Sequence, residues 1–323
     1  MHKYFCTLFD INYISFAKAL FSSLNNQEFK FTIFAFCMDD HSYHNLIESN
    51  TPNVVPIQLV DLENQLSELV IAKKTRNKVE FYYTCSPAIC KYVLEVFSNV
   101  NEITYLDSDL YFFSSPIAIF KEIDDANASV GIIEHRFSFL TKRNIIYGRF
   151  NVGWVTFKKD HSGLICLNSW YNDCINWCFQ RLEGEKYADQ KYLDNWPIKH
   201  ENVRIINNIG ANVAIWNIRN YNINYTHNKI FINDSPLIFY HFANLEQINY
   251  NKFKTNLSRV FMRCSGVIKD HIYLPYVNEI KKNQLYSIKS KNEISQSFVI
   301  RFIKQSTRKL RQIIFSDEIQ LTI

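Results

Sequence analysis

Glycine and proline are scarce in this sequence of 323 residues, with seven of each. Few of the residues that usually mark linkers are therefore present, and no low-complexity stretch or internal repeat divides the chain. The eight cysteines include no Cys-x-x-Cys pair, which argues against a zinc knuckle and against a dense disulfide framework. Scattered cysteines in apolar surroundings indicate a reducing compartment.

Long apolar runs and a net charge on the main body are also absent. No stretch approaches the roughly 18 to 20 apolar residues that cross a bilayer, and the first apolar run stops at Asp10, which argues against a signal peptide. We therefore expect a cytoplasmic protein. Residues 1–268 hold 26 basic and 26 acidic side chains, so we expect no nucleic-acid partner, which would require a basic face.

The sequence does contain an alternation of strand-like and helix-like patterns. Strand-like apolar runs occupy 4–9, 29–37, 54–60, 102–106, 129–134 and 152–157. Helical patterns occupy 13–24, 81–97 and 164–181, and Pro87 predicts a break or kink in the second. Apolar strands separated by helices predict an α/β fold with a mostly parallel sheet covered on both faces. We expect one domain over 1–260 and an extension over 261–323.

Two carboxylates, Asp107 and Asp109, follow the strand predicted at 102–106, with Ser108 between them. Alternate residues of an extended chain share one face, so these carboxylates converge beyond the strand end. Such a pair binds a hard divalent cation, which can hold a diphosphate. Asp10 and Asp39 also follow strands, and parallel sheets bind ligands at that edge. The structural alternative is a turn capped by aspartate.

Other short motifs accompany this pair in a fixed order. With it they occupy 5–13, 105–113, 150–154, 188–193, 210–212 and 239–242. Together they resemble the GT-A class of nucleotide-sugar glycosyltransferases, particularly bacterial enzymes related to glycosyltransferase family 8. The resemblance covers residues 4 to about 245. It implies a Rossmann-like GT-A fold and metal-dependent transfer of a sugar from a UDP-sugar to a glycan or lipid-linked glycan, as in surface polysaccharide or lipopolysaccharide synthesis.

The resemblance also implies a role for individual residues. Asp107, Asp109 and His241 correspond to ligands of Mn²⁺ or Mg²⁺, and an imidazole suits Mn²⁺ better than Mg²⁺. Taken alone, a histidine in the apolar run 238–242 is more often a buried core residue. The positions that correspond to the nucleotide-sugar site are Asp10, Asn12, Tyr13, Asp107, Ser108, Asn151 and Gly153.

Asp189 and Gln190 correspond to the pair beneath the reacting sugar carbon. In retaining members of the family, polar side chains here stabilise an oxocarbenium-like state, so a retaining reaction is implied. An inverting enzyme would need a general base, for which Glu134 and Asp189 are both candidates. The structural alternative is a helix start capped by Asp189.

The chain departs from family 8 after His241. The usual glycine and Lys-Pro-Trp segment, which binds the diphosphate, is replaced by residues 243–246. The cation for the diphosphate must then come from elsewhere, and the candidates are Lys73, Lys74, Arg76 and Lys78. These could equally form a solvated loop. The departure favours a sister family of family 8.

Residues 294–315 combine apolar and basic side chains at helical spacing. The pattern predicts an amphipathic helix on an anionic membrane, which would make the protein peripheral on the inner face of the cell membrane. A helix that docks a partner, or one that packs on the body, would have the same pattern.

Two other functions use similar residues. A haloacid-dehalogenase-like phosphatase also carries Asp-x-Asp at a strand end, but Tyr111 stands where that chemistry needs threonine or valine. A non-catalytic sugar-binding module would be expected to lose the acidic ligands, and both are present.

Overall fold

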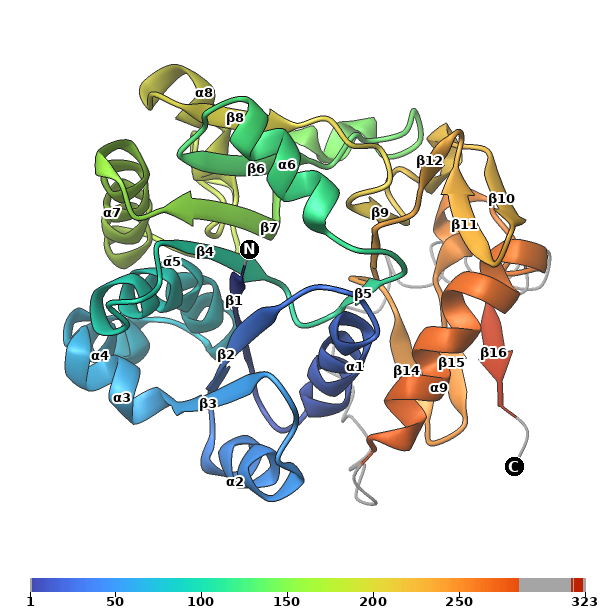
Figure 1. Cartoon of the computed structure of the whole chain (residues 1–323), viewed down its shortest axis with the longest axis horizontal. Coiled ribbons are helices and arrows are strands. Elements are labelled where there is room, and N and C mark those ends of the chain that lie inside the picture. The colour runs from blue at the N-terminus through green and yellow to red at the C-terminus, as the bar shows by residue number, and fades with distance from the viewer. Residues whose placement is uncertain (1, 285–314, 316, 322–323) are drawn as a thin grey trace, which may run out of the picture.

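A seven-stranded sheet forms the centre of the computed structural model, which describes residues 2–284, 315 and 317–321 (Figure 1). The strand order is β3-β2-β1-β4-β7-β6-β8. Only β7 runs antiparallel to its neighbours, so the predicted mostly parallel sheet is confirmed. The strands are β1 (Lys3–Phe9), β2 (Phe31–Cys37), β3 (Val54–Gln58), β4 (Glu102–Leu106), β6 (Val130–Glu134), β7 (Phe150–Lys158) and β8 (Val203–Ile206).

Helices cover both faces of this sheet, and each face has its own apolar core. Side chains of α5 and α7 pack with Cys6, Phe36 and Tyr105 on one face, and those of α1 and α6 pack with Phe5 and Trp154 on the other. Successive side chains of a strand, such as Phe5 and Cys6, enter opposite cores because the strand has a period of two. The helices are α1 (Ile14–Asn25), α2 (Asp40–Ser49), α3 (Leu59–Gln65), α4 (Glu68–Thr75), α5 (Lys78–Val96), α6 (Ile117–Asp125), α7 (His161–Asn176) and α8 (Trp196–Lys199).

Helix α5 continues through Pro87, so the predicted break is wrong, while the alternative of a kink stays a prediction. Asn77 caps the start of this helix by accepting from the N–H groups of Val79 and Glu80, each at 3.0 Å. Pro87 itself is buried inside the helix. Packing of the helix on the sheet therefore outweighs the local preference of proline for a break.

Small sheets lie beside the central one. The first joins β5 (Leu110–Phe112), β13 (Phe239–His241) and β9 (Val213–Ala214). The others are β10 (Ile223–Thr226) with β11 (Lys229–Ile232) and β12 (Ser235–Pro236), and β14 (Glu246–Asn249) with β15 (Lys252–Lys254) and β16 (Glu318–Gln320). The short helices are η1 (Lys142–Tyr147), η2 (Lys191–Asn195), η3 (Ile218–Asn220), η4 (Leu257–Val260) and η5 (Ile268–Tyr273).

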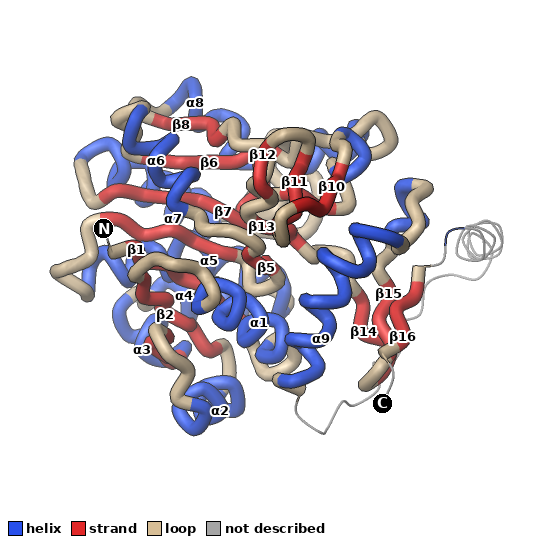
Figure 2. The backbone as a smooth tube through the Cα atoms, turned by 45° about the vertical axis from the view of Figure 1, so that its right-hand side comes forward, coloured by secondary structure: helices blue, strands red, loops and turns tan. Residues whose placement is uncertain are grey.

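Helix α9 (Leu274–Lys282) lies across α1, and β16 adds to the edge of β15 (Figure 2). Tyr276 of α9 stacks on Phe242, with ring centroids 3.8 Å apart. Asp317 accepts from the backbone N–H of Ser258 at 2.7 Å. The described parts of 261–323 thus share a core with the preceding residues, while the boundary at 260 stays a prediction. The helix predicted over 294–315 falls almost wholly outside the described residues. No helix in the described part of the chain is long and apolar enough to span a membrane.

Candidate active site

Asp107 lies where β4 leaves the sheet. Leu106 pairs with Trp154 of β7, and the N–H of Asp107 points to the carbonyl oxygen of Gly153 at 3.4 Å. Three residues after Asp107, Leu110 begins β5. The turn between the two strands therefore carries Asp107, Ser108 and Asp109 at the carboxyl end of β4, as the alternation of the sequence predicts.

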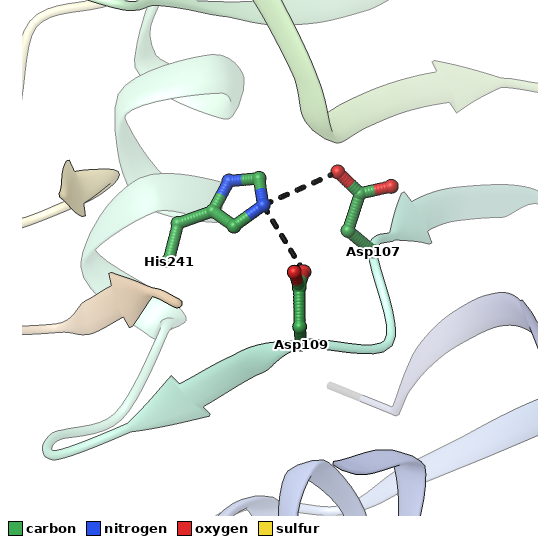
Figure 3. A group of neighbouring side chains, drawn as sticks. All are labelled: Asp107, Asp109 and His241. Carbon is green, nitrogen blue, oxygen red and sulfur yellow. Dashed lines mark ion pairs between the residues drawn. The ribbon is translucent and has the colours of Figure 1, made fainter. Parts of the chain in front are cut away.

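His241 reaches this turn through the pairing of β13 with β5. The antiparallel register places His241 opposite Leu110, and the N–H of Phe242 donates to the carbonyl oxygen of Asp109 at 3.0 Å. Nε2 of His241 lies 3.1 Å from Oδ1 of Asp109 and 3.5 Å from Oδ2 of Asp107 (Figure 3). One ligand atom from each of the three side chains lies within 4.8 Å of the others. The structure thus brings together the three predicted metal ligands.

Asn151 fixes the orientation of the His241 ring. Its Oδ1 accepts from the N–H of Gly153 at 3.1 Å and lies 3.1 Å from Nδ1 of His241. Because an amide oxygen only accepts, Nδ1 carries a proton, and the lone pair of the neutral ring is on Nε2, facing the two carboxylates. Nδ2 of Asn151 lies 3.3 Å from Nε2 of His135, whose Nδ1 lies 3.2 Å from the carbonyl oxygen of Arg149. Burial lowers the pKa of His135 to about 3, so this ring is neutral and can accept from Asn151.

Gly153 is required by the same arrangement. A Cβ at this position would lie 2.6 Å from Oδ1 of Asn151 and 2.9 Å from Cε1 of His241. Both separations are far below van der Waals contact, so any larger residue would displace the His241 ring or the amide that holds it. Gly153 therefore lets the backbone of β7 approach the His241 ring closely.

The electrostatics of the cluster suit a divalent cation. Burial raises the pKa of Asp107 to about 6, assisted by the charge of Asp109 and opposed by His241. Burial lowers the pKa of His241, but the carboxylates of Asp109 and Asp107 outweigh it and raise that pKa. No described lysine or arginine forms an ion pair with either carboxylate. Two carboxylate oxygens and one imidazole nitrogen, held by an outer hydrogen bond, therefore fit a Mn²⁺ or Mg²⁺ ion.

Replacing Asn151 with alanine is expected to weaken Mn²⁺ binding about 10- to 100-fold, the usual cost of losing an outer partner of a metal-bound histidine. Isothermal titration calorimetry with MnCl₂ measures the change. Asn101→Ala, at an exposed position, is the control and is expected to bind as the parent does. Equal affinity of Asn151→Ala and the parent would show that Asn151 does not orient a metal ligand.

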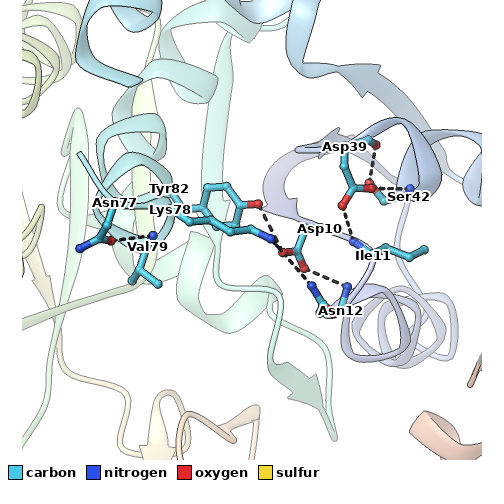
Figure 4. Close-up of polar contacts among 9 residues, drawn as sticks. All are labelled: Asp10, Ile11, Asn12, Asp39, Ser42, Asn77, Lys78, Val79 and Tyr82. Carbon is cyan, nitrogen blue, oxygen red and sulfur yellow. Dashed lines mark hydrogen bonds and ion pairs between the residues drawn. The ribbon is translucent and has the colours of Figure 1, made fainter. Parts of the chain in front are cut away.

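Asp10 is the centre of a second polar cluster, at the end of β1 (Figure 4). Its carboxylate accepts from the N–H of Asn12 at 2.9 Å, from Nδ2 of Asn12 at 3.2 Å and from the hydroxyl of Tyr82 at 3.3 Å, and it forms an ion pair with Lys78. Burial raises the pKa of Asp10, but the hydrogen bonds from Lys78 and Asn12 lower it below the usual value overall. Two predicted donor-site residues, Asn12 and Lys78, therefore meet on Asp10.

Tyr13 lies near both this cluster and the metal ligands. Burial raises the pKa of its phenol to about 12, and the nearby charges of Asp109, Asp10 and Asp107 add to the shift. The side chain is nevertheless 47% exposed, and its ring lies 5.3 Å from that of Phe16. An exposed aromatic ring next to acidic side chains is suited to stacking on a flat heterocycle.

Asp189 and Gln190 lie in the loop after α7. Burial raises the pKa of Asp189 to about 7, opposed by a hydrogen bond from Ser86 and assisted by the charge of Asp107. Asp189 thus lies near enough to the metal ligands to sense their charge. Nε2 of Gln190 donates to the carbonyl oxygen of Tyr147 at 3.0 Å. Residues 135–149, which include Tyr147, link β6 to β7.

The remaining predicted residues make other contacts. Nη2 of Arg76 donates to the carbonyl oxygen of Ile175 at 2.6 Å, and Lys73 pairs with Glu63. Glu134 pairs with Arg149. Asp39 caps α2 and accepts from the N–H of Ile11 at 3.0 Å, so it holds the loop that carries Asp10 and Asn12 (Figure 4). Of the four basic residues predicted to bind the diphosphate, Lys78 is the one that the structure places against another residue of the predicted nucleotide-sugar site, Asp10.

Sequence reasoning missed the side chains that support the site. They are Tyr82, Ser86, Tyr105, His135 and Trp216. Apart from Tyr105, none belongs to a local motif, because each of the others reaches its partner across the fold. The one available signal is that Tyr105 precedes Asp107 by two residues and therefore shares its strand face; its hydroxyl donates to Oδ1 of Asp107 at 3.0 Å.

Known proteins resemble this chain in sequence and in fold. YfnD of Bacillus subtilis, an uncharacterized protein, is 30% identical over an alignment of 285 residues, and the match covers 86% of this chain and 89% of YfnD. YfnF of the same bacterium, also uncharacterized, is 31% identical over an alignment of 262 residues, and the match covers 79% of this chain and 85% of YfnF. Models of known protein families give no match.

Among solved structures, the galactosyltransferase LgtC in complex with donor and acceptor sugar analogues matches with a TM-score of 0.50 at 12% identity. The match covers 88% of this chain and 97% of LgtC. This likeness confirms the predicted GT-A fold, a mostly parallel sheet flanked by helices. Membership of glycosyltransferase family 8 stays a prediction.

Proposed function

The chain belongs to the same protein family as YfnD and YfnF of Bacillus subtilis, and we propose that it is a metal-dependent glycosyltransferase. In this proposal it moves a sugar from a nucleotide-sugar, with a UDP-sugar as the favoured donor, to a glycan or lipid-linked glycan. The observation that carries the proposal is the convergence of Asp107, Asp109 and His241 at the carboxyl edge of a GT-A sheet, near Asp10 and Asp189.

Different residues of the site would bind the metal ion and the nucleoside. Asp107, Asp109 and His241 would hold Mn²⁺ or Mg²⁺, which when bound neutralises charge on the departing diphosphate. Asp10, Asn12 and Tyr13 would hold the nucleoside, because a carboxylate and an amide hydrogen-bond to hydroxyls and base edges, and the exposed ring of Tyr13 stacks. Lys78, which is paired with Asp10, supplies a cation beside them.

Asp189 and Gln190 would face the reacting carbon of the sugar. The polar oxygens of both side chains stabilise positive charge that develops on the ring, which corresponds to a retaining reaction. With its pKa near 7, Asp189 can also exchange a proton at neutral pH, so it is the candidate base for an inverting reaction. The configuration of the product distinguishes these roles.

A donor screen tests the proposal. We expect UDP-sugars to raise the melting temperature in the presence of Mn²⁺ and not after EDTA treatment, because a ligand at about 100 times its Kd stabilises a protein by about 2.7 kcal/mol. Release of UDP on addition of an acceptor extract measures transfer. If no nucleotide binds and simple phosphate esters are hydrolysed instead, the phosphatase alternative replaces the proposal. Sugar binding without turnover would indicate a non-catalytic module.

A further inference from the structure

The connection between β6 and β7 exposes a cluster of apolar side chains. We call residues 139–147, which include η1, the exposed loop. Phe139 is 91% exposed, and the apolar side chains of Leu140, Ile145, Ile146 and Tyr147 are 38–49% exposed. Single exposed apolar residues are common, but several neighbours in one short segment mark a surface that contacts something else.

Hydrogen bonds hold the exposed loop in this position at several points. The hydroxyl of Thr141 donates to the carbonyl oxygen of Trp216 at 2.6 Å, and the N–H of Ser138 donates to the same oxygen at 2.8 Å. At the other end Gln190 donates to the carbonyl oxygen of Tyr147. The backbone is therefore anchored to the body while the apolar side chains stay in solvent. The last of these bonds joins the loop directly to a candidate catalytic residue.

The charges of the exposed loop all have one sign. Lys142 and Arg143 are exposed, and neither forms an ion pair within the described part of the chain. The sequence from 135 to 159 contains no aspartate or glutamate. Apolar side chains next to unpaired cations are the combination that binds an anionic lipid interface, where the former enter the headgroup region and the latter meet phosphates.

We propose that the exposed loop docks on an anionic lipid surface. The side chains of leucine and isoleucine form no hydrogen bonds with a carbohydrate, so binding of a glycan does not account for the exposure of Leu140, Ile145 and Ile146. A second copy of the same loop would bring like charges together, which disfavours a symmetric contact. Docking through this loop carries Gln190, and with it the reaction site, to the lipid surface. The proposal concerns a segment separate from residues 294–315 and does not depend on sugar transfer.

Vesicle co-sedimentation of the full chain tests the proposal, with no donor or metal present. The vesicles are phosphatidylcholine alone or an equimolar mixture of phosphatidylcholine and phosphatidylglycerol. We expect binding to the mixed vesicles and about tenfold weaker binding by Phe139→Ser/Ile146→Ser and by Lys142→Gln/Arg143→Gln. The matched control is Val70→Ser/Ile71→Ser, which removes two exposed apolar side chains from α4 and should bind as the parent does.

The basic residues of 294–315 are present in all these proteins, so a difference between variants reports on the exposed loop. Unchanged melting temperatures confirm that the substitutions leave the fold intact. Equal binding by the parent and both loop variants overturns the proposal. A parent that stays in the supernatant with both compositions also overturns it and would leave the loop as a contact for another protein. Because no sugar is transferred in this assay, its failure does not bear on the proposed function.

Discussion

Replacing Asp109 with asparagine is expected to lower the rate of sugar transfer by about 1,000-fold. Asparagine keeps the size of the side chain but removes the charge that lies 3.1 Å from Nε2 of His241. A bound metal ion supplies several kcal/mol of charge stabilisation, and about 4 kcal/mol corresponds to a factor of about 1,000 in rate. Steady-state release of UDP in the presence of Mn²⁺ measures the effect.

Asp125→Asn is the control for this substitution. Asp125 is 63% exposed at the end of α6 and pairs only with Lys121 among the described residues, so activity should not change. The melting temperature of both variants checks that each is folded. Turnover of Asp109→Asn at the parent rate, with the same response to EDTA, would remove Asp109 from the set of metal ligands.

Replacing Asp189 with asparagine is expected to abolish most transfer while stabilising the protein at neutral pH. The pKa of Asp189 rises from 3.8 to about 7 because the side chain is buried. Charging it in the folded state therefore costs up to about 4 kcal/mol, and asparagine carries no such cost. Loss of the carboxylate from beneath the sugar is expected to reduce the rate at least about 100-fold. Initial rates and urea unfolding measure the two effects.

The stability difference has a defined dependence on pH. Between about pH 4 and pH 7 the folded parent binds one more proton at Asp189 than the unfolded chain does, so its stability falls as the pH rises. Asp189→Asn does not lose stability in this way. The difference in unfolding free energy between the variant and the parent should therefore be absent at pH 4, grow up to pH 7 and stay constant above pH 7. Asp234→Asn, at an exposed turn, should show no such change. An equal advantage at pH 4 and pH 8 would mean that Asp189 does not titrate in this range.

The sequence was sufficient to predict the sheet and the carboxylate pair because both depend on short-range patterns. Strands such as β1 and β4 are apolar runs that end at an aspartate, and the convergence of Asp107 and Asp109 needs only a spacing of two. The fold class and the edge that carries the site follow from these runs. The break at Pro87 was predicted from the same local rules, and it failed because packing on the sheet dominates there.

The position of His241 beside the two carboxylates could not be predicted from short-range patterns in the sequence. Its place beside Asp109 results from the register of β13 against β5, which joins segments far apart in the chain. The family resemblance alone indicated it. The same resemblance assigned Asn151 to the nucleotide-sugar site, a role that stays a prediction, while the structure adds the hydrogen bond that Asn151 accepts from Nδ1 of His241. No sequence pattern expresses a contact between two side chains from different strands of different sheets.

The contact of Asp317 with Ser258 bears on how the basic residues of 294–315 can be tested. Asp317 caps the backbone of Ser258, β16 pairs with β15, and α9 packs on α1, so the described elements before and after residues 294–315 are both attached to the body. In the sequence, residues 294–315 therefore lie between two anchored elements. A truncation from residue 290 onward would therefore expose the edge of β15 and remove an acceptor from Ser258. A deletion within residues 294–315 that retains 317–321 is the change that isolates the contribution of the basic side chains to membrane binding.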